Sequence, residues 1–353
     1  YLAQDADFVV RYQGGNNAGH TVVNDFGEFK LHLLPSGVFN PNVINVLGPG
    51  MVIDIEALVS EIEEVRERGI DPNLRISERA TICFPFHRLE DGWEEERLGK
   101  NAYGSTRRGI APAYGDRTVK KAIQMGELLY PECLREHLRR VVDWKLLHAE
   151  RLYGKPNAFS FEEMLEWAER FGAALKPLIC DTSELLETGA AQGKNILFEA
   201  QLGTLRDLNF GIYPFSTSSC TLAAFAPIGG GLFTRKPDRV MAVVKAFSTC
   251  VGEGPFVTLM DAEEADALRK AANEYGAATG RPRTIGHFDA LATRYGAWAQ
   301  GATEIALTKL DSLSGRPSLK ICTDYTYRGE RMGRFPLNAV LDEAEPVYEE
   351  LPG

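Results

Sequence analysis

A chain of 353 residues, 44% hydrophobic and 25% charged, is long enough to bury a large core, as one α/β domain or as two smaller ones. No run of about 18 apolar residues occurs, which excludes a membrane-spanning helix of the usual kind. The formal net charge of −10 argues against a broad nucleic-acid-binding surface, although it leaves room for a local basic pocket that binds a small anion.

Short apolar runs typical of buried strands recur along the chain, with helical patterns between them. The runs are 7–10, 42–48, 195–200, 239–247, 304–310 and 318–325. Residues 54–69 place apolar side chains on one helical face and end at Gly69, and Ser160 with Glu163 forms a capping box before another amphipathic helix. Because no repeat or linker interrupts this alternation, residues 1–353 are predicted to form one large α/β domain with a central, mostly parallel β-sheet flanked by helices.

The first apolar run is followed by the Gly- and Asn-rich stretch "QGGNNAGH" at residues 13–20. Glycine and asparagine tolerate positive φ, and glycine lets a ligand approach bare backbone. Ligands of parallel sheets bind beyond the carboxyl ends of the strands, where this stretch falls. Taken alone, it fits either an ordinary tight turn or a ligand-binding loop.

Further polar turns of the same character lie at 101–117, 198–221, 248–258, 276–290 and 307–311. Arg281 and Arg283 suit a clamp for a carboxylate or a phosphate. The carboxylate of Asp311 can accept the N1–H and N2–H groups of guanine while the stem of Lys309 covers the ring. A solvated loop or a capping serine explains any one of these turns, but together they predict a site for two or more anionic ligands.

The order of six motifs carries a resemblance that extends over the whole chain. The motifs are "QGGNNAGHTVV", "GSTRRGIAPAYGDR", "GIYPFSTSS", "VGEGPFVT", "TGRPRTIGHFDA" and "LTKLD". With them the chain resembles the adenylosuccinate synthetase family, which implies a P-loop-NTPase-like fold and a cytoplasmic homodimer with shared active sites. The resemblance also implies a ligase of AMP biosynthesis that joins L-aspartate to IMP, with GTP as co-substrate and Mg²⁺ as cofactor, through 6-phosphoryl-IMP.

The resemblance implies roles for the residues at matching positions. His20 would be the catalytic acid on the transferring phosphoryl group, and the backbone carbonyl of Gly19 would bind Mg²⁺. The implied IMP-binding residues are Asn17, Ala18, Gly19, His20, Thr106, Lys120, Gln201, Leu202, Thr217 and Arg281. Those implied for aspartate are Ala278, Thr279, Gly280, Arg281 and Arg283. Those implied for GTP are Gly19, His20, Thr21, Arg283, Lys309, Leu310 and Asp311.

Four positions depart from the family pattern. Lys120 stands where the family has an arginine donated across the dimer interface, so the charge is kept but the bidentate fork is lost. The family's Glu-Gly-Ala-Gln-Gly motif reads Glu-Ala-Gln-Leu-Gly at 199–203, so either Gln201 reaches the purine by another path or Leu202 stands in its place. In the aspartate loop, Thr284 removes a positive charge and Ala278 replaces a threonine.

The family also has a Gly-Asp-Glu-Gly-Lys-Gly-Lys loop, which would precede Tyr1, and a further segment that would follow Gly353. Residues 1–353 alone are therefore expected to be inactive, whereas a longer chain that contains both segments would be an ordinary enzyme; the absence of an initial methionine favours the longer chain. Two other functions stay open: a phage-type ligase that joins aspartate to dGMP, and a catalytically silent nucleotide-binding homologue.

The remaining titratable residues receive structural interpretations. Six cysteines without a CxxC pair indicate reduced thiols rather than a zinc site or a disulfide framework. The acidic runs at 61–67 and 94–96 are interpreted as solvated helix faces. His87, His137 and His148 are interpreted as surface or satisfied core residues.

Overall fold

The computed structural model describes residues 2–276 and 280–353, and its internal contacts divide the chain into two compact units. Unit 1 comprises Tyr1–Leu202, Thr217–Thr221 and Phe225–Lys236, and unit 2 comprises Gly203–Ser216, Leu222–Ala224 and Pro237–Gly353. The chain changes unit several times between residues 202 and 237, which explains why the sequence contains no single linker.

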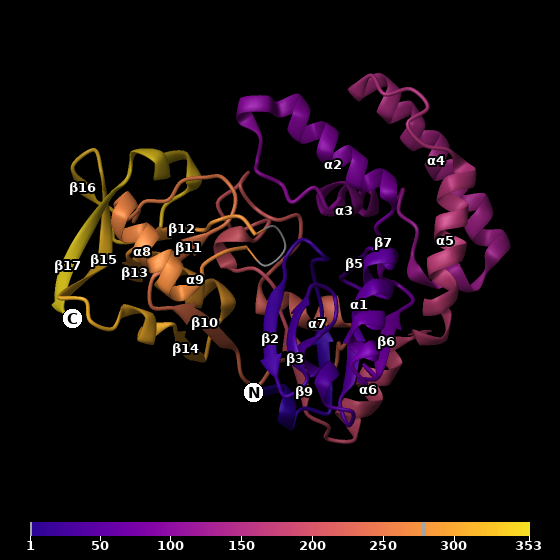
Figure 1. The fold of residues 1–353 in the computed structure, drawn as a ribbon, viewed down its shortest axis with the longest axis horizontal. Helices are drawn as coiled ribbons and strands as arrows, with labels where there is room; N and C mark the ends of the chain where they lie inside the picture. The colour runs from indigo at the N-terminus through magenta and orange to yellow at the C-terminus, as the bar shows by residue number, and fades with distance from the viewer. Residues whose placement is uncertain (1, 277–279) are drawn as a thin grey trace. The chain divides into compact units, whose positions relative to one another are not determined.

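Unit 1 is built on a five-stranded parallel sheet, as the alternation of apolar runs and helical patterns predicted (Figure 1). In spatial order its strands are β8 (Ile179–Cys180), β6 (Leu74–Ser77), β4 (Ile44–Leu47), β1 (Phe8–Arg11) and β9 (Ile196–Glu199). The interior strand β1, next to the edge strand β9, is buried along its whole length, and Val10 lies in register with Val46 on one side and Phe198 on the other. Shorter pairs accompany this sheet: the antiparallel hairpin β2 (His20–Asn24) with β3 (Gly27–Leu31), and the parallel pair β5 (Val52–Ile53) with β7 (Thr81–Ile82).

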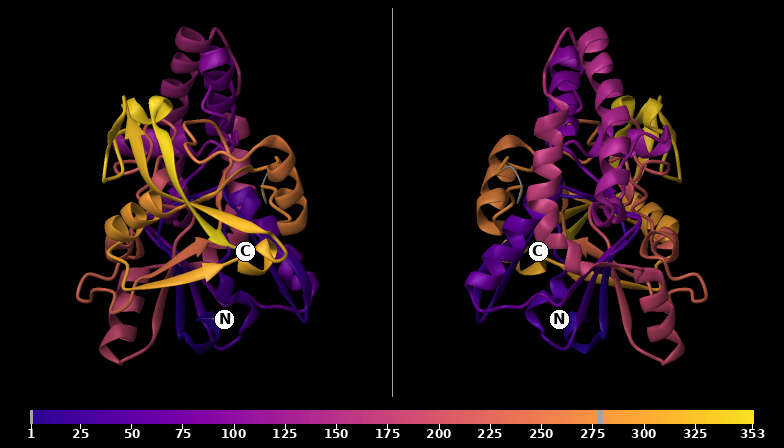
Figure 2. Two further views of the ribbon diagram at one scale, coloured as in Figure 1. Left: turned by 90° about the vertical axis from the view of Figure 1, so that its left-hand side faces the viewer. Right: turned by 90° about the vertical axis from the view of Figure 1, so that its right-hand side faces the viewer.

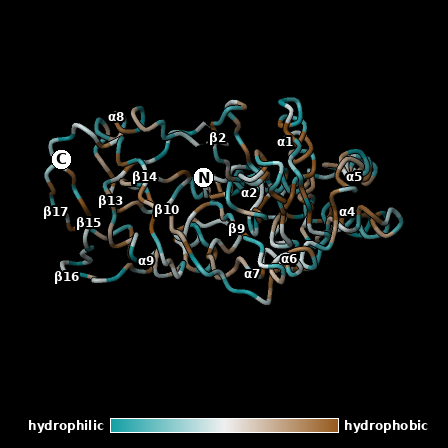
Figure 3. The backbone as a smooth tube through the Cα atoms, turned by 90° about the horizontal axis from the view of Figure 1, so that it is seen from below, coloured by the Kyte–Doolittle hydropathy of each residue, from teal (hydrophilic) through white to brown (hydrophobic). Residues whose placement is uncertain are grey.

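Helices of unit 1 cover the sheet and form its main core. They are α1 (Ile55–Glu67), α2 (Pro85–Leu98), α3 (Ile110–Thr118), α4 (Pro131–Tyr153), α5 (Phe161–Leu175), α6 (Thr182–Ala191) and α7 (Ala226–Gly230). The predicted helix at 54–69 is α1, capped by the Asp54 side chain and followed by Gly69 at φ +78°, and the capping box of Ser160 and Glu163 begins α5. Figures 1 and 2 show α4 and α5 side by side, and Figure 3 shows hydrophobic and hydrophilic residues mixed along both, as expected for helices that bury one face.

A buried charge network fixes the positions of α2, α3 and α4. The ammonium group of Lys145 on α4 lies 2.7 Å from Glu90 Oε2 on α2 and 2.6 Å from Asp116 Oδ2 on α3. His87 Nδ1 accepts the amide hydrogen of Phe84, so Nε2 carries the ring proton and donates it to Asp116 Oδ2 at 2.9 Å. Burial lowers the pKa of His87, which keeps the ring neutral. His87 is thus a satisfied core residue, as the sequence indicated.

Unit 2 contains smaller sheets and two α-helices in its described part. The parallel pair is β10 (Met241–Lys245) with β14 (Glu304–Thr308), and the antiparallel pair is β11 (Ser248–Cys250) with β12 (Thr284–Gly286). A third sheet, whose yellow strands stand out in Figure 2, contains β13 (Phe288–Asp289), β15 (Ser318–Tyr327), β16 (Glu330–Arg331) and β17 (Glu345–Pro352). The helices are α8 (Ala262–Ala272) and α9 (Ala290–Gln300). Within residues 2–276 and 280–353, no helix is both long and apolar enough to cross a membrane.

Candidate functional site

A buried arginine ends β1, an interior strand of the parallel sheet in unit 1. Arg11, only 1% exposed, donates from Nη2 to Gln201 Oε1 at 2.7 Å, and its Nη1 lies 3.6 Å from Glu199 Oε1. Glu199 also accepts the backbone amide hydrogen of Ser36 at 2.9 Å. A buried guanidinium is stable only when such partners surround it. Arg11 therefore joins the carboxyl ends of β1 and β9 at the sheet edge where the sequence predicted a ligand site.

Side-chain amides hold the Gly- and Asn-rich loop that follows β1. Gln13 Nε2 donates to the Gln201 carbonyl at 2.7 Å, and Ser219 Oγ donates to Gln13 Oε1 at 2.8 Å. Gln201 Nε2 in turn donates to the Gly15 carbonyl at 3.2 Å. Gly14 adopts φ +79°, and a Cβ atom there would overlap the amide of Gln201, so only glycine fits. The loop is thus shaped by unit 1 itself.

Tyr114 on α3 braces the same loop from a second direction. Its hydroxyl accepts the amide hydrogen of Gly14 at 2.8 Å and donates to the Gly50 carbonyl at 2.8 Å. Burial raises the pKa of Tyr114 to about 12, so the hydroxyl keeps its proton at neutral pH. Tyr114 thereby links α3 to the loop that carries His20.

Two carboxylates on α2 hold the loop at 103–109. Glu95 accepts the backbone amide hydrogens of Tyr103, Gly104 and Ser105, each at 3.0 Å. Asp91 accepts the Ser105 hydroxyl at 2.6 Å and the amide of Gly109 at 2.9 Å. Glu95 is buried, so the interpretation of 94–96 as a solvated face is wrong at this residue; its carboxylate replaces water as the partner of three loop amides.

His20, the first residue of β2, presents an unsatisfied nitrogen. Its Nε2 is buried and has no hydrogen-bond partner in the part of the chain that the structure describes. Burial lowers the pKa of His20; Glu199 opposes this effect, whereas Arg11 and His32 add to it. A buried polar atom without a partner is rare in folded proteins, and a bound ligand is a common explanation.

Of the residues that the resemblance assigns to IMP, the structure brings three together in unit 1. Asn17 Nδ2 lies 3.5 Å from Thr217 Oγ1, and Gln201 Nε2 lies 3.4 Å from Asn17 Oδ1. Gln201 is buried, and its amide forms hydrogen bonds with Arg11 and with the Gly15 carbonyl. It therefore holds the Asn17 side chain in place. Leu202 has φ +67° and is 45% exposed. Because the glutamine is shifted by one position, Leu202 is exposed, whereas Gln201 is buried and supports the loop that follows β1.

The other residues of unit 1 that the resemblance assigns to a substrate are two neighbours of Asn17 in the loop after β1 and three residues that are exposed or half-buried. The Ala18 carbonyl lies 3.3 Å from His32 Nδ1, and a Cβ atom at Gly19 would meet that nitrogen at 2.6 Å. Thr21 is exposed on β2, Thr106 is half-buried in the loop at 103–109, and Lys120 is exposed with φ +64° after α3.

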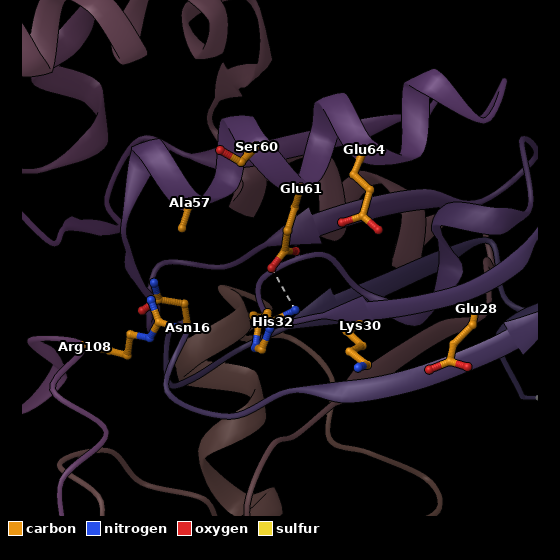
Figure 4. A pocket seen from close by; sticks show the side chains of 9 residues that line it. All are labelled: Asn16, Glu28, Lys30, His32, Ala57, Ser60, Glu61, Glu64 and Arg108. Carbon is orange, nitrogen blue, oxygen red and sulfur yellow. Dashed lines mark hydrogen bonds between the residues drawn. The ribbon is translucent and has the colours of Figure 1, made fainter. Parts of the chain in front are cut away.

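A pocket of about 580 Å³ lies between β3 and α1 (Figure 4). Its lining residues are Asn16, Glu28, Lys30, His32, Ala57, Ser60, Glu61, Glu64 and Arg108, none of which the resemblance assigns to a substrate. Glu61 accepts the amide hydrogens of His32, Leu33 and Leu34 at 2.8 to 3.1 Å and is buried, so the expected solvated face at 61–67 is wrong at this residue too.

In unit 2, the two residues expected to bind guanine follow β14. Lys309 adopts φ +60° and its ammonium group donates to the Ala272 carbonyl at 3.0 Å. Leu310 and Asp311 are both exposed in the short 3₁₀-helix Leu310–Leu313. The positive φ of Lys309 turns the chain so that the helix begins directly after the strand.

The segment assigned to aspartate forms a loop between α8 and β12. Ala278 and Thr279 lie outside the described residues. Gly280 has φ +65°, Arg281 is exposed, and Arg283 Nε lies 3.2 Å from a carboxylate oxygen of the buried Glu274. Glu274 is a charged partner that the sequence analysis missed, because nothing in the local pattern marks it.

The described residues offer few ligands for a metal ion. No group of three or more His, Cys, Asp or Glu side chains in residues 2–276 and 280–353 is placed to hold one. The Gly19 carbonyl is a hard oxygen of the kind that Mg²⁺ prefers, but Mg²⁺ in nucleotide enzymes is bound largely by phosphate oxygens and water. These residues therefore fit Mg²⁺ only as a minor part of its coordination, beside a nucleotide.

Comparisons with known proteins agree with the motifs. The family model described as adenylosuccinate synthetase matches residues 1–353. Adenylosuccinate synthetase 2 of Pseudoalteromonas translucida is 53% identical over 352 residues, which cover 99% of this chain and 83% of that protein. The adenylosuccinate synthetase of Caldanaerobacter subterraneus is 45% identical over 359 residues, covering 100% and 83%.

Two solved structures show the fold. The fully ligated adenylosuccinate synthetase from Plasmodium falciparum superposes with a TM-score of 0.92 at 33% identity, covering 100% of this chain and 83% of its own. Cyanophage S-2L succinoaminodeoxyadenylate synthetase, bound to dGMP and dATP, gives a TM-score of 0.58 at 18% identity, with coverage of 98% and 89%. The second likeness shows a shared fold only.

The hydroxyl of Tyr114 gives a direct test of how the loop is held. In Tyr114→Phe the Gly14 amide and the Gly50 carbonyl both lose a buried partner. We expect the free energy of unfolding in urea to fall by about 1–3 kcal/mol. Tyr213→Phe, which changes a tyrosine that is 65% exposed, should leave the free energy of unfolding unchanged. Equal stability of the two variants would show that Tyr114 does not brace the loop.

Proposed function

Because the chain belongs to the adenylosuccinate synthetase family and so catalyses the GTP-dependent ligation of L-aspartate to IMP, we propose which of its residues bind each substrate. Unit 1 would bind IMP and the transferring phosphoryl group, because it carries His20, Asn17 and Thr217. Unit 2 would bind guanine and aspartate, because it carries Asp311 and Arg281. The observation that carries the proposal is the buried, unpartnered Nε2 of His20 at the carboxyl end of the parallel sheet.

Two chemical steps explain the need for GTP. The 6-oxygen of IMP is a poor leaving group, so the γ-phosphoryl group of GTP is first transferred to it, and GDP is released. The amine of aspartate then attacks C6, and the 6-oxygen leaves as part of inorganic phosphate, giving adenylosuccinate. Positioning and electrostatic stabilisation provide most of the catalysis in such transfers.

In this scheme His20 changes its charge when substrates bind. The sequence suggested a histidine protonated near neutral pH, but burial lowers its pKa in the ligand-free protein. An incoming phosphoryl group brings negative charge to Nε2, which raises the pKa of an imidazole. His20 would therefore take up a proton only with substrate present, and then donate a hydrogen bond to the phosphoryl oxygens.

Most of the proposed IMP contacts are side chains and backbone of unit 1. Asn17 and Thr217 would donate to or accept from IMP, and Gln201 would hold Asn17 in place. The further proposed IMP contacts are Ala18, Gly19, Thr106, Lys120, Leu202 and Arg281. The amides of the loop at 103–109, shaped by Glu95, would support Thr106 there.

GTP and aspartate would be held as the resemblance implies. Asp311 would accept the N1–H and N2–H groups of guanine, with Lys309 and Leu310 against the ring. Arg283 would bind phosphate oxygens of GTP, together with the backbone of Gly19, His20 and Thr21. Mg²⁺, which neutralises phosphate charge when bound, would take the Gly19 carbonyl as one ligand. The proposed aspartate contacts are Ala278, Thr279, Gly280, Arg281 and Arg283.

We favour IMP over dGMP as the substrate. The two relatives described above, at 45% and 53% identity, are both adenylosuccinate synthetases, whereas the phage protein bound to dGMP is only 18% identical. We also propose a cytoplasmic location, because the charges of IMP and GTP prevent them from crossing a membrane unaided.

Turnover of the full-length protein with IMP, aspartate, GTP and Mg²⁺ tests this function. Adenylosuccinate absorbance should rise with IMP but not with dGMP. His20→Ala should lower kcat by about 10²–10⁴-fold, the usual contribution of a general acid. His137→Ala, which removes a histidine bound to Glu127 on the protein surface, should stay active. Product from dGMP alone, or from neither substrate, would contradict the proposal.

The surface around Lys120 supports a homodimer. Exposed apolar side chains gather in the sequence after α3 and on α4: Val119, Leu129, Tyr130, Trp144, Leu147 and Leu152. Trp144 and Leu147 lie three residues apart on one face of α4, and the ammonium group of Lys121 lies 5.2 Å from the centroid of the Trp144 ring. Aromatic and apolar residues are typical of interface centres. We propose that this surface joins two subunits and that Lys120 acts in the partner's active site.

Mixing two inactive variants tests whether Lys120 crosses the interface. Lys120→Ala and His20→Ala each damage a different part of the shared site. After denaturation and refolding together, about one quarter of the sites should regain both side chains if subunits pair at random in a two-fold dimer. His20→Ala mixed with the double variant should recover nothing. A mixture that shows no recovery although mixed dimers are present by mass spectrometry would disprove the shared site.

A further inference from the structure

Glu274 is a buried carboxylate, 3% exposed, directly after α8 in unit 2. One of its oxygens, Oε2, lies 2.6 Å from the ammonium group of Lys245 and 3.2 Å from Nε of Arg283. Lys245 ends β10, and Arg283 comes just before β12. A single buried carboxylate thus joins a cation at the end of β10 to a cation just before β12.

The backbones of Glu274 and Arg283 are also joined by a hydrogen bond. The amide of Arg283 donates to the Glu274 carbonyl at 3.1 Å, and Tyr275 and Pro282 form the next bridge. The amide of Gly276 donates to the Arg281 carbonyl at 2.8 Å. The two charged side chains therefore stand at the base of the loop whose members are assigned to aspartate.

The guanidinium of Arg283 is held by one nitrogen only. Its Nε donates a hydrogen bond to the Tyr275 carbonyl at 3.3 Å and forms an ion pair with Glu274 Oε2 at 3.2 Å. The terminal nitrogens Nη1 and Nη2 have no hydrogen-bond partner within the ranges that the structure describes. Two parallel N–H donors in this arrangement match a phosphate or a carboxylate in the bidentate manner.

Lys245 gives the cluster of Glu274, Lys245 and Arg283 a net positive charge. Glu274 with Arg283 alone would be neutral and would attract a phosphate weakly. Lys245, held also by the Thr249 hydroxyl at 3.0 Å, compensates the carboxylate, so that the guanidinium keeps its attraction for an anion. Burial lowers the pKa of Lys245, and Glu274 opposes that effect. Lys309 adds a further positive charge to this neighbourhood, its ammonium bonded to the Ala272 carbonyl.

We propose that Glu274, with Lys245 as its counterion, is the positioning residue that aims the free fork of Arg283 at the phosphates of GTP. This inference rests on the proposed role of Arg283 in binding GTP. It assigns no contact with substrate to Glu274 itself. Its consequence is that loss of the carboxylate should weaken GTP binding specifically.

Calorimetric titration of the full-length Glu274→Gln variant with GTP and Mg²⁺ tests the inference without requiring turnover. Glutamine keeps the shape but loses the charge, so we expect the Kd for GTP to rise roughly tenfold or more, as for loss of a charge-assisted, bidentate contact. The KM for IMP at saturating GTP should change little. Glu263→Gln, which changes an exposed glutamate on the preceding helix α8, should behave as the wild type.

Two results would overturn the inference. One is an unchanged Kd for GTP in Glu274→Gln. The other is a loss that affects all substrates equally and accompanies a lower melting temperature, which indicates a merely structural role. Failure of the proposed function differs from both, because the wild type itself would then form no adenylosuccinate.

Chemical rescue gives a second readout that does not depend on the folding of Glu274→Gln. Arg283→Ala should leave a space beside the Glu274 carboxylate, and added guanidinium ion at millimolar concentration should enter it and restore part of the GTP affinity. Methylammonium, which lacks the fork, should restore less. An absence of rescue by guanidinium would count against Glu274 as the group that orients Arg283.

Discussion

The buried guanidinium of Arg11 lies at the carboxyl end of the interior strand β1, and the candidate IMP site of unit 1 depends on how its charge is paired. An unpaired charge at this position would destabilise the fold by several kcal/mol. Glu199 and Gln201 pair with its two terminal nitrogens, and Gln201 is then placed to bond the loop that follows β1. The requirement to pair one buried cation thus also fixes the loop that carries Asn17 and His20.

Carboxylates that bind backbone amides organise the segments around this loop. Glu61 holds the segment after β3, and Asp91 with Glu95 holds the loop at 103–109. Each replaces the water that a surface loop would otherwise need for its amide hydrogens. In unit 2, Glu274 acts on side chains instead, through Lys245 and Arg283. Buried acids therefore shape loops that would be mobile if only solvent satisfied them.

Local patterns allowed the framework to be predicted from the sequence. The run at 7–10 forms β1, the run at 195–200 contains β9, and Gly69 follows the end of α1. These features could be predicted because the spacing of apolar residues and the capping residues depend only on residues close in the sequence. The order of the motifs also identified the family correctly. The tertiary partners could not be predicted: Glu95 looked like one acid in an exposed run, and nothing local pairs Arg11 with Gln201, which lies 190 residues away. Such contacts exist only once the strands are adjacent.

Hydrogen exchange of the loop at residues 13–19 in Arg11→Met tests most directly whether Arg11 preorganises this site. Methionine removes the charge and both hydrogen-bond donors while it fills much of the same volume. We predict that exchange of these loop amides becomes roughly tenfold faster or more, whereas the amides of α5 exchange as in the wild type. Arg135→Met, at an exposed position of α4, should change neither. Unaltered exchange of the loop in Arg11→Met would contradict the account.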